Sequence, residues 1–271
     1  MLLAPLPRPL TGTEVRPVNN PATPAPYYAD ELVTLYHGDC REVLPGLPAA
    51  DVLITDPPYA SAAATATTGW AKQKWGGNWG DMSLVTLMAE MTLGAVKLHA
   101  EHEVYWFADH LSYAALIPVF FRRYPVVQSI IWDRDMLGMG AYYRKQTEFI
   151  LYCRTRNAAA FPSKTARDLI RIKPDYSERE HPAQKPVRLV LELLANSAAG
   201  IVIDPYAGAG TTLVAAKQLG RRVIGIEIEE RYCEAAARRL SQGVLGEETP
   251  VAGIARLPEP TQQPMFGLEA S

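Results

Sequence analysis

The sequence predicts an α/β protein built on a doubly wound, mostly parallel sheet. Predicted strands alternate with predicted helices from residue 32 to residue 240, and the strands are continuous apolar runs, as in sheets covered by helices on both faces. The chain has 271 residues, of which 48% are apolar and 21% charged, so it can bury a large core and is not a disordered protein.

Each predicted strand is a short run of aliphatic, β-branched or aromatic residues, and most are followed by glycine or an acidic residue. The strands cover residues 32–36, 51–55, 103–108, 126–132, 147–153, 201–203 and 222–226. Apolar residues at helical spacing predict helices over residues 83–99, 111–123, 186–199, 211–219 and 230–240. Pro186 stands near a first turn, where a helix tolerates proline, whereas Pro118 argues against the second helix.

The chain divides into three segments. Residues 1–30 hold seven of the 22 prolines and show no period, which predicts an irregular N-terminal arm. Residues 31–241 form the predicted domain, and the Pro/Gly-rich residues 242–271 form a flexible tail. No apolar run is long enough to span a membrane, and prolines interrupt the N-terminus, so it makes a poor signal peptide.

Charge and cysteine usage exclude several classes of protein. The formal net charge is −2, so the chain does not coat nucleic acid by bulk charge, and a nucleic-acid site would have to be a local patch. The cysteines are Cys40, Cys153 and Cys233, without a CxxC motif or a Cys/His cluster. We therefore expect no metal site, no disulfide framework and a reducing cytoplasm.

A glycine-rich loop lies between the predicted strand at 201–203 and the helix that follows it. Gly208 and Gly210 allow the backbone to approach a ligand closely, and the helix N-terminus behind them offers unpaired N–H groups. Asp204 precedes the loop, and Glu227 ends the next strand, where an acid can accept hydrogen bonds from ribose hydroxyls. The pattern predicts a site for an adenosine-type cofactor; an ordinary packing turn is the alternative.

A second motif, Asp56-Pro57-Pro58-Tyr59, ends the predicted strand at 51–55. Its prolines stiffen the turn and remove two backbone donors, which leaves the Asp56 carboxylate and the Pro57 carbonyl as acceptors of fixed direction. An exocyclic amine offers two donors to such a pair, and Tyr59 offers a flat face on which a base can stack. The motif predicts a site for an amino-bearing base; a rigid structural turn is the alternative.

Together the two motifs resemble those of the amino-group DNA methyltransferases that use S-adenosylmethionine. The resemblance covers residues 32–240, with Tyr206 in the cofactor loop where Phe is commoner. The catalytic turn precedes the cofactor loop, which is the circularly permuted order of the family's β group, found largely in bacteria and phages. The resemblance implies a Rossmann-like methyltransferase sheet of about seven strands. It also implies a protein of the cytoplasm, near the nucleoid of a bacterial or phage-infected cell.

The resemblance also assigns residues to the cofactor. Residues 181–186 (His-Pro-Ala-Gln-Lys-Pro) resemble the segment that closes over its methionine part, and Asp39 resembles the acid that contacts its adenine. The expected cofactor-binding residues are Asp39, Cys40, His181, Gln184, Lys185, Pro186, Asp204, Tyr206, Ala207, Gly208, Gly210, Thr211, Thr212 and Glu227. Residues 147–150 resemble a strand that walls the target-base pocket.

Two segments are predicted to contact double-stranded DNA. Residues from about 154 to 180 form a short target-recognition insert that is rich in basic residues. Residues 61–81 interleave aromatic and basic side chains, which suits a loop that closes over a flipped base. The expected DNA-binding residues are Trp70, Lys72, Lys74, Arg154, Arg156, Lys164, Arg167, Arg171 and Lys173. The alternatives are a solvated basic loop and a loop pinned to the core by Trp75 and Trp79.

The reaction implied by the resemblance is direct methyl transfer to the N6 amine of a flipped adenine, as in restriction-modification enzymes. Asp56 would orient the amine, and no Pro-Cys turn offers the thiolate that C5-cytosine chemistry needs. In this family Asp at the first position of the motif goes more with adenine, and Ser more with cytosine. An N4-cytosine enzyme, an RNA substrate and an idle module that binds cofactor and DNA remain the alternatives.

Two protein partners are expected. The β group often dimerises, so the resemblance implies a homodimer. Residues Gln262–Phe266 resemble the short peptides by which bacterial replication proteins bind the sliding clamp, and an inert tail is the alternative.

Overall fold

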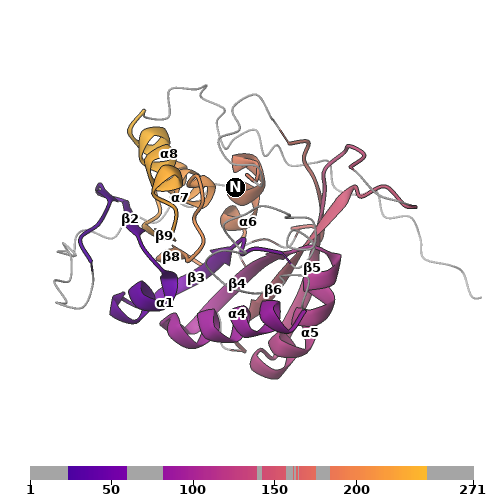
Figure 1. Cartoon of the computed structure of the whole chain (residues 1–271). Helices are drawn as coiled ribbons and strands as arrows, with labels where there is room; N and C mark the ends of the chain where they lie inside the picture. Colours follow the sequence, from indigo (N-terminus) through magenta and orange to yellow (C-terminus); the bar gives the residue numbers. More distant parts are fainter. Residues whose placement is uncertain are drawn as a thin grey trace, which may run out of the picture.

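A nine-stranded sheet in the order β1-β2-β9-β8-β3-β4-β6-β5-β7 forms the centre of the molecule (Figure 1). A computed structural model describes residues 24–59, 82–138, 142–156, 161, 163, 165–174 and 184–242. The strands are β1 (Tyr28–Ala29), β2 (Val33–His37), β3 (Ala50–Thr55), β4 (Leu98–Ala108), β5 (Val126–Asp133), β6 (Thr147–Arg154), β7 (Leu169–Arg171), β8 (Val202–Asp204) and β9 (Val223–Glu227). Strands β2, β9, β8, β3 and β4 are parallel, and β6 is antiparallel to both its neighbours.

Helices cover both faces of this sheet (Figure 1). They are α1 (Cys40–Val43), the 3-10 helix η1 (Leu44–Gly46), α4 (Met82–Ala95), α5 (His110–Arg123), α6 (Val187–Ala195), α7 (Thr211–Gln218) and α8 (Glu230–Ser241). Successive residues of β3 show the two layers, because Leu53 belongs to the buried cluster of α1, α4 and α5, whereas Val52 and Ile54 belong to that of α6, α7 and α8. This arrangement confirms the doubly wound fold. Within the described part of the chain no helix is long and apolar enough to cross a membrane.

The seven predicted strands and five predicted helices are all present, and the differences lie at their ends. The helix predicted over residues 83–99 ends at Ala95, and β4 begins at Leu98, where it pairs with Ala50 of β3. The two additional strands are β1 and β7, which lie at the edges of the sheet. Each has two or three residues and lacks the three consecutive aliphatic residues that mark even the shortest predicted strand, at 201–203.

The carboxyl ends of the central parallel strands meet at one edge of the sheet, here called the carboxyl edge. Between β8 and β3 the direction in which the chain crosses the sheet reverses, because the strand after β8, β9, lies on one side and the strand after β3, β4, lies on the other. In open α/β sheets, ligands bind outside the carboxyl ends of the strands at such a switch point. The glycine-rich loop follows β8 and the Asp-Pro-Pro-Tyr turn follows β3, so the two motifs face this crevice side by side.

Candidate active site

The Asp-Pro-Pro-Tyr turn carries a partly exposed carboxylate whose two oxygens are both engaged. The Tyr59 hydroxyl donates to Asp56 Oδ1 at 2.5 Å and lies 3.2 Å from Glu148 Oε2 on β6. Lys185 Nζ donates to Asp56 Oδ2 at 2.6 Å. Burial, followed by the charges of Asp56 and Glu148, raises the pKa of Tyr59 well above its ordinary value, so the phenol stays a donor. The carboxylate is therefore held in one orientation by two donors.

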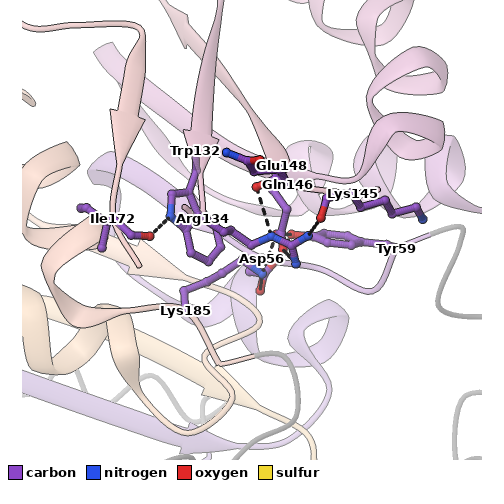
Figure 2. A network of polar contacts seen from close by, with 9 residues as sticks. All are labelled: Asp56, Tyr59, Trp132, Arg134, Lys145, Gln146, Glu148, Ile172 and Lys185. Carbon is purple, nitrogen blue, oxygen red and sulfur yellow. Dashed lines mark hydrogen bonds and ion pairs between the residues drawn. The ribbon is translucent and has the colours of Figure 1, made fainter. Parts of the chain in front are cut away.

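Lys185 is the buried centre of this network (Figure 2). Its side chain is 7% exposed, and Nζ lies 3.3 Å from Glu148 Oε2 as well as beside Asp56. The ammonium also lies 5.0 Å from the ring centroid of Tyr59, within cation–π range. Burial acts to lower the pKa of Lys185, but the two carboxylates outweigh it and raise that pKa above its ordinary value. Lys185 is thus a charged donor at this site and not a base.

Arg134, immediately after β5, supports the network from the other side (Figure 2). Its Nη1 lies 3.6 Å from Glu148 Oε1, and its Nη2 donates to the Lys145 carbonyl at 2.7 Å. The Nε donates to the Gln146 carbonyl at 3.3 Å. One guanidinium therefore connects the end of the β5–β6 loop to the carboxylate that contacts Tyr59 and Lys185.

The glycine-rich loop is connected by a hydrogen bond to the residue that precedes the Asp-Pro-Pro-Tyr turn. Asp204 Oδ1 accepts from Thr55 Oγ1 at 2.9 Å and from the Tyr206 N–H at 3.0 Å. Burial raises the pKa of Asp204 to about 6, although hydrogen bonds, including one from Thr212, act to lower it. Since Thr55 is the residue before Asp56, this hydrogen bond fixes the spacing between the two motifs.

The two glycines of the loop have left-handed backbone conformations that a side chain would disfavour. Gly208 has φ +52° and Gly210 has φ +79°. A Cβ on Gly210 would also meet the Ala236 Cβ at 2.8 Å, and Gly210 is the N-cap residue of α7. A Cβ on Gly208 would meet nothing within 4 Å among the described atoms, so the loop is open there. This geometry suits a backbone that approaches a ligand.

Glu227, at the end of β9, faces the same loop. Its carboxylate accepts from the Gly208 N–H at 2.8 Å and from the Glu229 N–H at 2.7 Å. Burial raises the pKa of Glu227, against the lowering effect of these backbone hydrogen bonds. The carboxylate is therefore fixed in direction beside Gly208, where an acid can accept hydrogen bonds from the hydroxyls of a ribose.

The other predicted cofactor residues surround this loop. Asp39 caps α1 and pairs with Arg41 at the end of β2, the strand next to β9. Cys40 is buried in the core beneath the loop, and burial raises the pKa of its thiol to about 11. Ala207 is also buried, and Thr211 and Thr212 form the first turn of α7. Gln184 and Pro186 flank Lys185 just before α6, and His181 lies outside the described residues.

The predicted DNA-binding residues do not share one surface. Arg154 ends β6 on the side away from the carboxyl edge, where it lies opposite Glu103 in the middle of β4, and its guanidinium lies 3.9 Å from the Glu103 carboxylate. Arg154 and Arg156 line a pocket of about 580 Å³ at that opposite edge. Arg171 instead lies beside Asp133 at the carboxyl edge, with Nε 2.8 Å from its carboxylate. Arg167 and Lys173 are exposed on either side of β7, and Trp70, Lys72, Lys74 and Lys164 lie outside the described residues.

Three features of the carboxyl edge were absent from the predicted site residues, although Glu148 lies in the segment 147–150 that the resemblance assigned to the wall of the target-base pocket. Glu148 and Arg134 complete the charged network, and Tyr142 and Tyr143 on the β5–β6 loop are 96% and 95% exposed. A glutamate inside the otherwise apolar strand at 147–153 was the signal available for Glu148. Arg134 gave no such signal, because its role depends on a neighbouring strand.

Comparison with known proteins agrees with this geometry. A family model described as DNA methylase matches residues 50–238. YubD of Escherichia coli (strain K12), a methylase by name, is 30% identical over 220 residues, which cover 75% of this chain and 88% of YubD. The type II methyltransferase M2.DpnII of Streptococcus pneumoniae is 26% identical over 246 residues, which cover 79% of this chain and 92% of that protein.

Two solved structures have the same fold. The M1.HpyAVI–SAM complex superposes with a TM-score of 0.57 at 23% identity, covering 77% of this chain and 100% of that one. The cytosine-N4-specific PvuII DNA methyltransferase superposes with a TM-score of 0.61 at 14% identity, covering 84% of this chain and 92% of that one. At these identities the likeness concerns the fold.

Proposed function

This chain belongs to the DNA methylase family of N6 and N4 amino-methyltransferases, and we propose that it methylates the N6 amine of adenine at specific sites in double-stranded DNA. The observation that carries the proposal is the hydrogen bond of 2.9 Å from Thr55 to Asp204. It joins the turn suited to an amino-bearing base to the loop suited to an adenosine-type cofactor, at the switch point of the sheet. Both halves of a methyl-transfer site therefore lie next to one another.

The residues around the glycine-rich loop fit S-adenosylmethionine, the cofactor of this family. Glu227 would offer its fixed carboxylate to the ribose, Asp39 after the neighbouring strand β2 would contact the adenine, and Gly208 leaves open space for close approach. When bound, S-adenosylmethionine supplies a methyl group activated by its sulfonium. The chain's own contribution is to hold that group and the target amine in one line, which accounts for much of the rate in such reactions.

Asp56 is proposed to accept a hydrogen bond from the target amine and to direct its lone pair. The Pro57 carbonyl offers the second acceptor, and Tyr59 offers a ring on which the flipped base stacks, offsetting part of the cost of flipping. As the new N–C bond forms, the bond from the methyl group to sulfur would break and the cofactor would leave as a neutral thioether. The proton would leave the amine late, once methylation has made it acidic, and pass to water. No thiolate takes part, because Cys40, Cys153 and Cys233 are all buried and burial raises the pKa of each thiol.

Adenine is preferred to cytosine because Asp56 stands at the first position of the motif, where this family more often has Asp with adenine and Ser with cytosine. The fold does not distinguish them, since the PvuII enzyme shares it and is cytosine-N4-specific. An N4-cytosine methyltransferase on the same site is the second candidate function.

DNA is proposed to bind across the carboxyl edge. The β5–β6 loop presents Tyr142 and Tyr143 there, followed by the exposed Arg144 and Lys145, and its end is held by Arg134. Aromatic and cationic side chains side by side suit stacking on bases and pairing with phosphates. Arg167, Arg171 and Lys173 extend this surface, whereas Arg154 and Arg156 lie at the opposite edge. The contacts proposed for Trp70, Lys72, Lys74 and Lys164 fall outside the described residues.

A catalytic domain over residues 31–241, a homodimer and clamp binding through Gln262–Phe266 complete the proposal. The clamp segment lies outside the described residues. Size-exclusion chromatography with light scattering, and binding of a peptide of this segment to a bacterial clamp, test the last two.

The decisive experiment is nucleoside mass spectrometry on DNA and RNA from a methylation-free bacterial host that expresses this chain. The Asp56→Ala variant removes the amine acceptor, and Asp30→Ala is the matched control, because Asp30 pairs with Lys217 at the same 2.6 Å as Asp56 with Lys185. We expect N6-methyladenine in DNA with the native chain and with Asp30→Ala, and none with Asp56→Ala.

Other outcomes of this experiment separate the alternatives. N4-methylcytosine in place of N6-methyladenine would select the second candidate function. A methylated base in RNA alone would exclude DNA as the substrate. An absence of methylated bases, with S-adenosylmethionine still bound by the purified protein, would indicate an idle binding module.

A further inference from the structure

Lys185 is the part of the site that the proposed reaction leaves without a role. Its ammonium is buried 2.6 Å from Asp56 and 3.3 Å from Glu148. The target amine gains positive charge as it is methylated, and a neighbouring cation opposes that change by Coulomb repulsion. A buried ammonium beside the amine acceptor should therefore have a function that offsets this repulsion.

We propose that Lys185 donates a hydrogen bond to the ring nitrogen next to the target amine and so selects amino-bearing bases. This inference rests on the proposed function. Adenine and cytosine present an amine donor beside a ring-nitrogen acceptor, whereas guanine and thymine present an oxygen acceptor beside an N–H donor. Asp56 and Lys185 form an acceptor beside a donor, the complement of the first arrangement and a mismatch to the second.

The donors at the site allow this contact. An ammonium has three N–H donors, and within the described residues Asp56 and Glu148 account for two of them. The Tyr59 hydroxyl now occupies Asp56 Oδ1, and it already lies 3.2 Å from Glu148 Oε2, to which it can turn. An entering amine can thus replace the hydroxyl on Oδ1 while Lys185 stays on Oδ2.

Lys185 is also anchored at both ends, as a selective donor must be. Its backbone carbonyl accepts from Thr211 Oγ1 at 3.3 Å, in the first turn of the helix behind the glycine-rich loop. Its ammonium is held by Glu148, whose other oxygen lies 3.6 Å from Arg134 Nη1. A base hydrogen-bonded to Lys185 would be positioned relative to the cofactor loop as well as to the catalytic turn.

A double-mutant cycle in which Lys185 and the ring nitrogen of the substrate are changed separately and together tests this inference. The recognition sequence is first found by methylation-sensitive sequencing of DNA from the expressing host. The substrates are duplexes with this sequence that carry either the natural target base or its deaza analogue, in which C–H replaces the ring nitrogen beside the amine. We expect the native enzyme to lose about 10- to 100-fold in kcat/KM on the deaza duplex. The Lys185→Met variant should methylate both duplexes at similar rates, because its side chain cannot read the ring nitrogen.

The controls separate this role from support of Asp56 alone. Lys185→Arg keeps a hydrogen-bond donor, so its kcat/KM should still be lower on the deaza duplex than on the natural one. This variant tests the inference even where Lys185→Met does not fold. Lys217→Met, at a lysine–aspartate pair of equal length, should behave as the native chain. Equal deaza penalties in the native and Lys185→Met enzymes would overturn the inference and leave the proposed function intact. A native chain that methylates neither duplex would overturn the proposed function and this inference with it.

Discussion

Two lysine–aspartate pairs in this protein have the same length and different surroundings. Lys185 lies 2.6 Å from Asp56 at the carboxyl edge, and Lys217 lies 2.6 Å from Asp30, where α7 meets the start of the sheet. The Lys185 side chain is 7% exposed and has Glu148 as a second anion, whereas that of Lys217 is 27% exposed. Distance alone therefore does not identify a functional pair; burial and additional partners do.

The largest expected difference between the pairs is their coupling in stability. Lys185→Met leaves the carboxylates of Asp56 and Glu148 without their shared buried cation, and Asp56→Ala leaves the ammonium with Glu148 in place of two carboxylates. These two variants and the double variant should give a coupling free energy of about 2 kcal/mol. The corresponding cycle on Asp30 and Lys217 should give about 0.5 kcal/mol, because solvent screens an exposed pair. Urea unfolding of the six variants and the native chain measures both cycles. Equal couplings would mean that burial does not distinguish the pairs.

A smaller effect, on catalysis, should follow when the Glu148 carboxylate is removed so that the Lys185 pair has one anion, as the Lys217 pair does. Among the described residues, Glu148→Gln leaves Asp56 as the one carboxylate beside Lys185, and it leaves two cations, Lys185 and Arg134, near an amine that becomes positive. We expect kcat to fall about 10-fold, or about 1.4 kcal/mol in the activation free energy, with little change in KM for the cofactor. Steady-state kinetics checks this value. An unchanged kcat would limit Glu148 to a structural role.

The same contrast explains how far the sequence predicts the molecule. Asp56, Gly208 and Glu227 stand in short local motifs whose chemistry follows from neighbouring residues. The strands β3 and β9 are mostly apolar runs of six and five residues, and the short β8 is predicted from the aliphatic residues 201–203 that lead into the glycine-rich loop. Their meeting at one edge follows from the parallel sheet.

The remaining site residues depend on contacts between distant segments. Lys185 stands in a motif that the resemblance assigns to the cofactor, yet its side chain extends to Asp56, 129 positions away, while only its carbonyl contacts the cofactor loop. The basic residues from Arg154 onward lie in one short segment of the sequence. The structure divides them between the carboxyl edge and the opposite end of the strands, because β6 runs away from the carboxyl edge and β7 returns toward it. Strand direction, and not composition, decides which of its charges can face DNA.

The smallest expected effect concerns the surface pair and its dependence on pH. Partial burial acts to raise the pKa of Asp30, but hydrogen bonds from Lys217, Tyr28 and the Leu32 N–H outweigh it and lower that pKa to about 2. Since the folded pKa lies below the unfolded value of 3.8, the stability from ionised Asp30 is present above about pH 4 and is lost as the pH falls toward 2. With allowance for solvent screening it amounts to about 1 kcal/mol.

The Asp30→Asn variant isolates that contribution. Its free energy of unfolding should lie about 1 kcal/mol below that of the native chain at pH 6, and the two should converge as the pH approaches 2. Asp51→Asn is a useful control, since Asp51 accepts from the Ile201 N–H and forms no salt bridge within the described residues, although it interacts with the charge of Arg221. A gap between native and Asp30→Asn proteins that stayed constant from pH 6 to pH 3 would show that the Lys217 pair acts through packing. The two lysine pairs would then differ in the kind of interaction as well as in its strength.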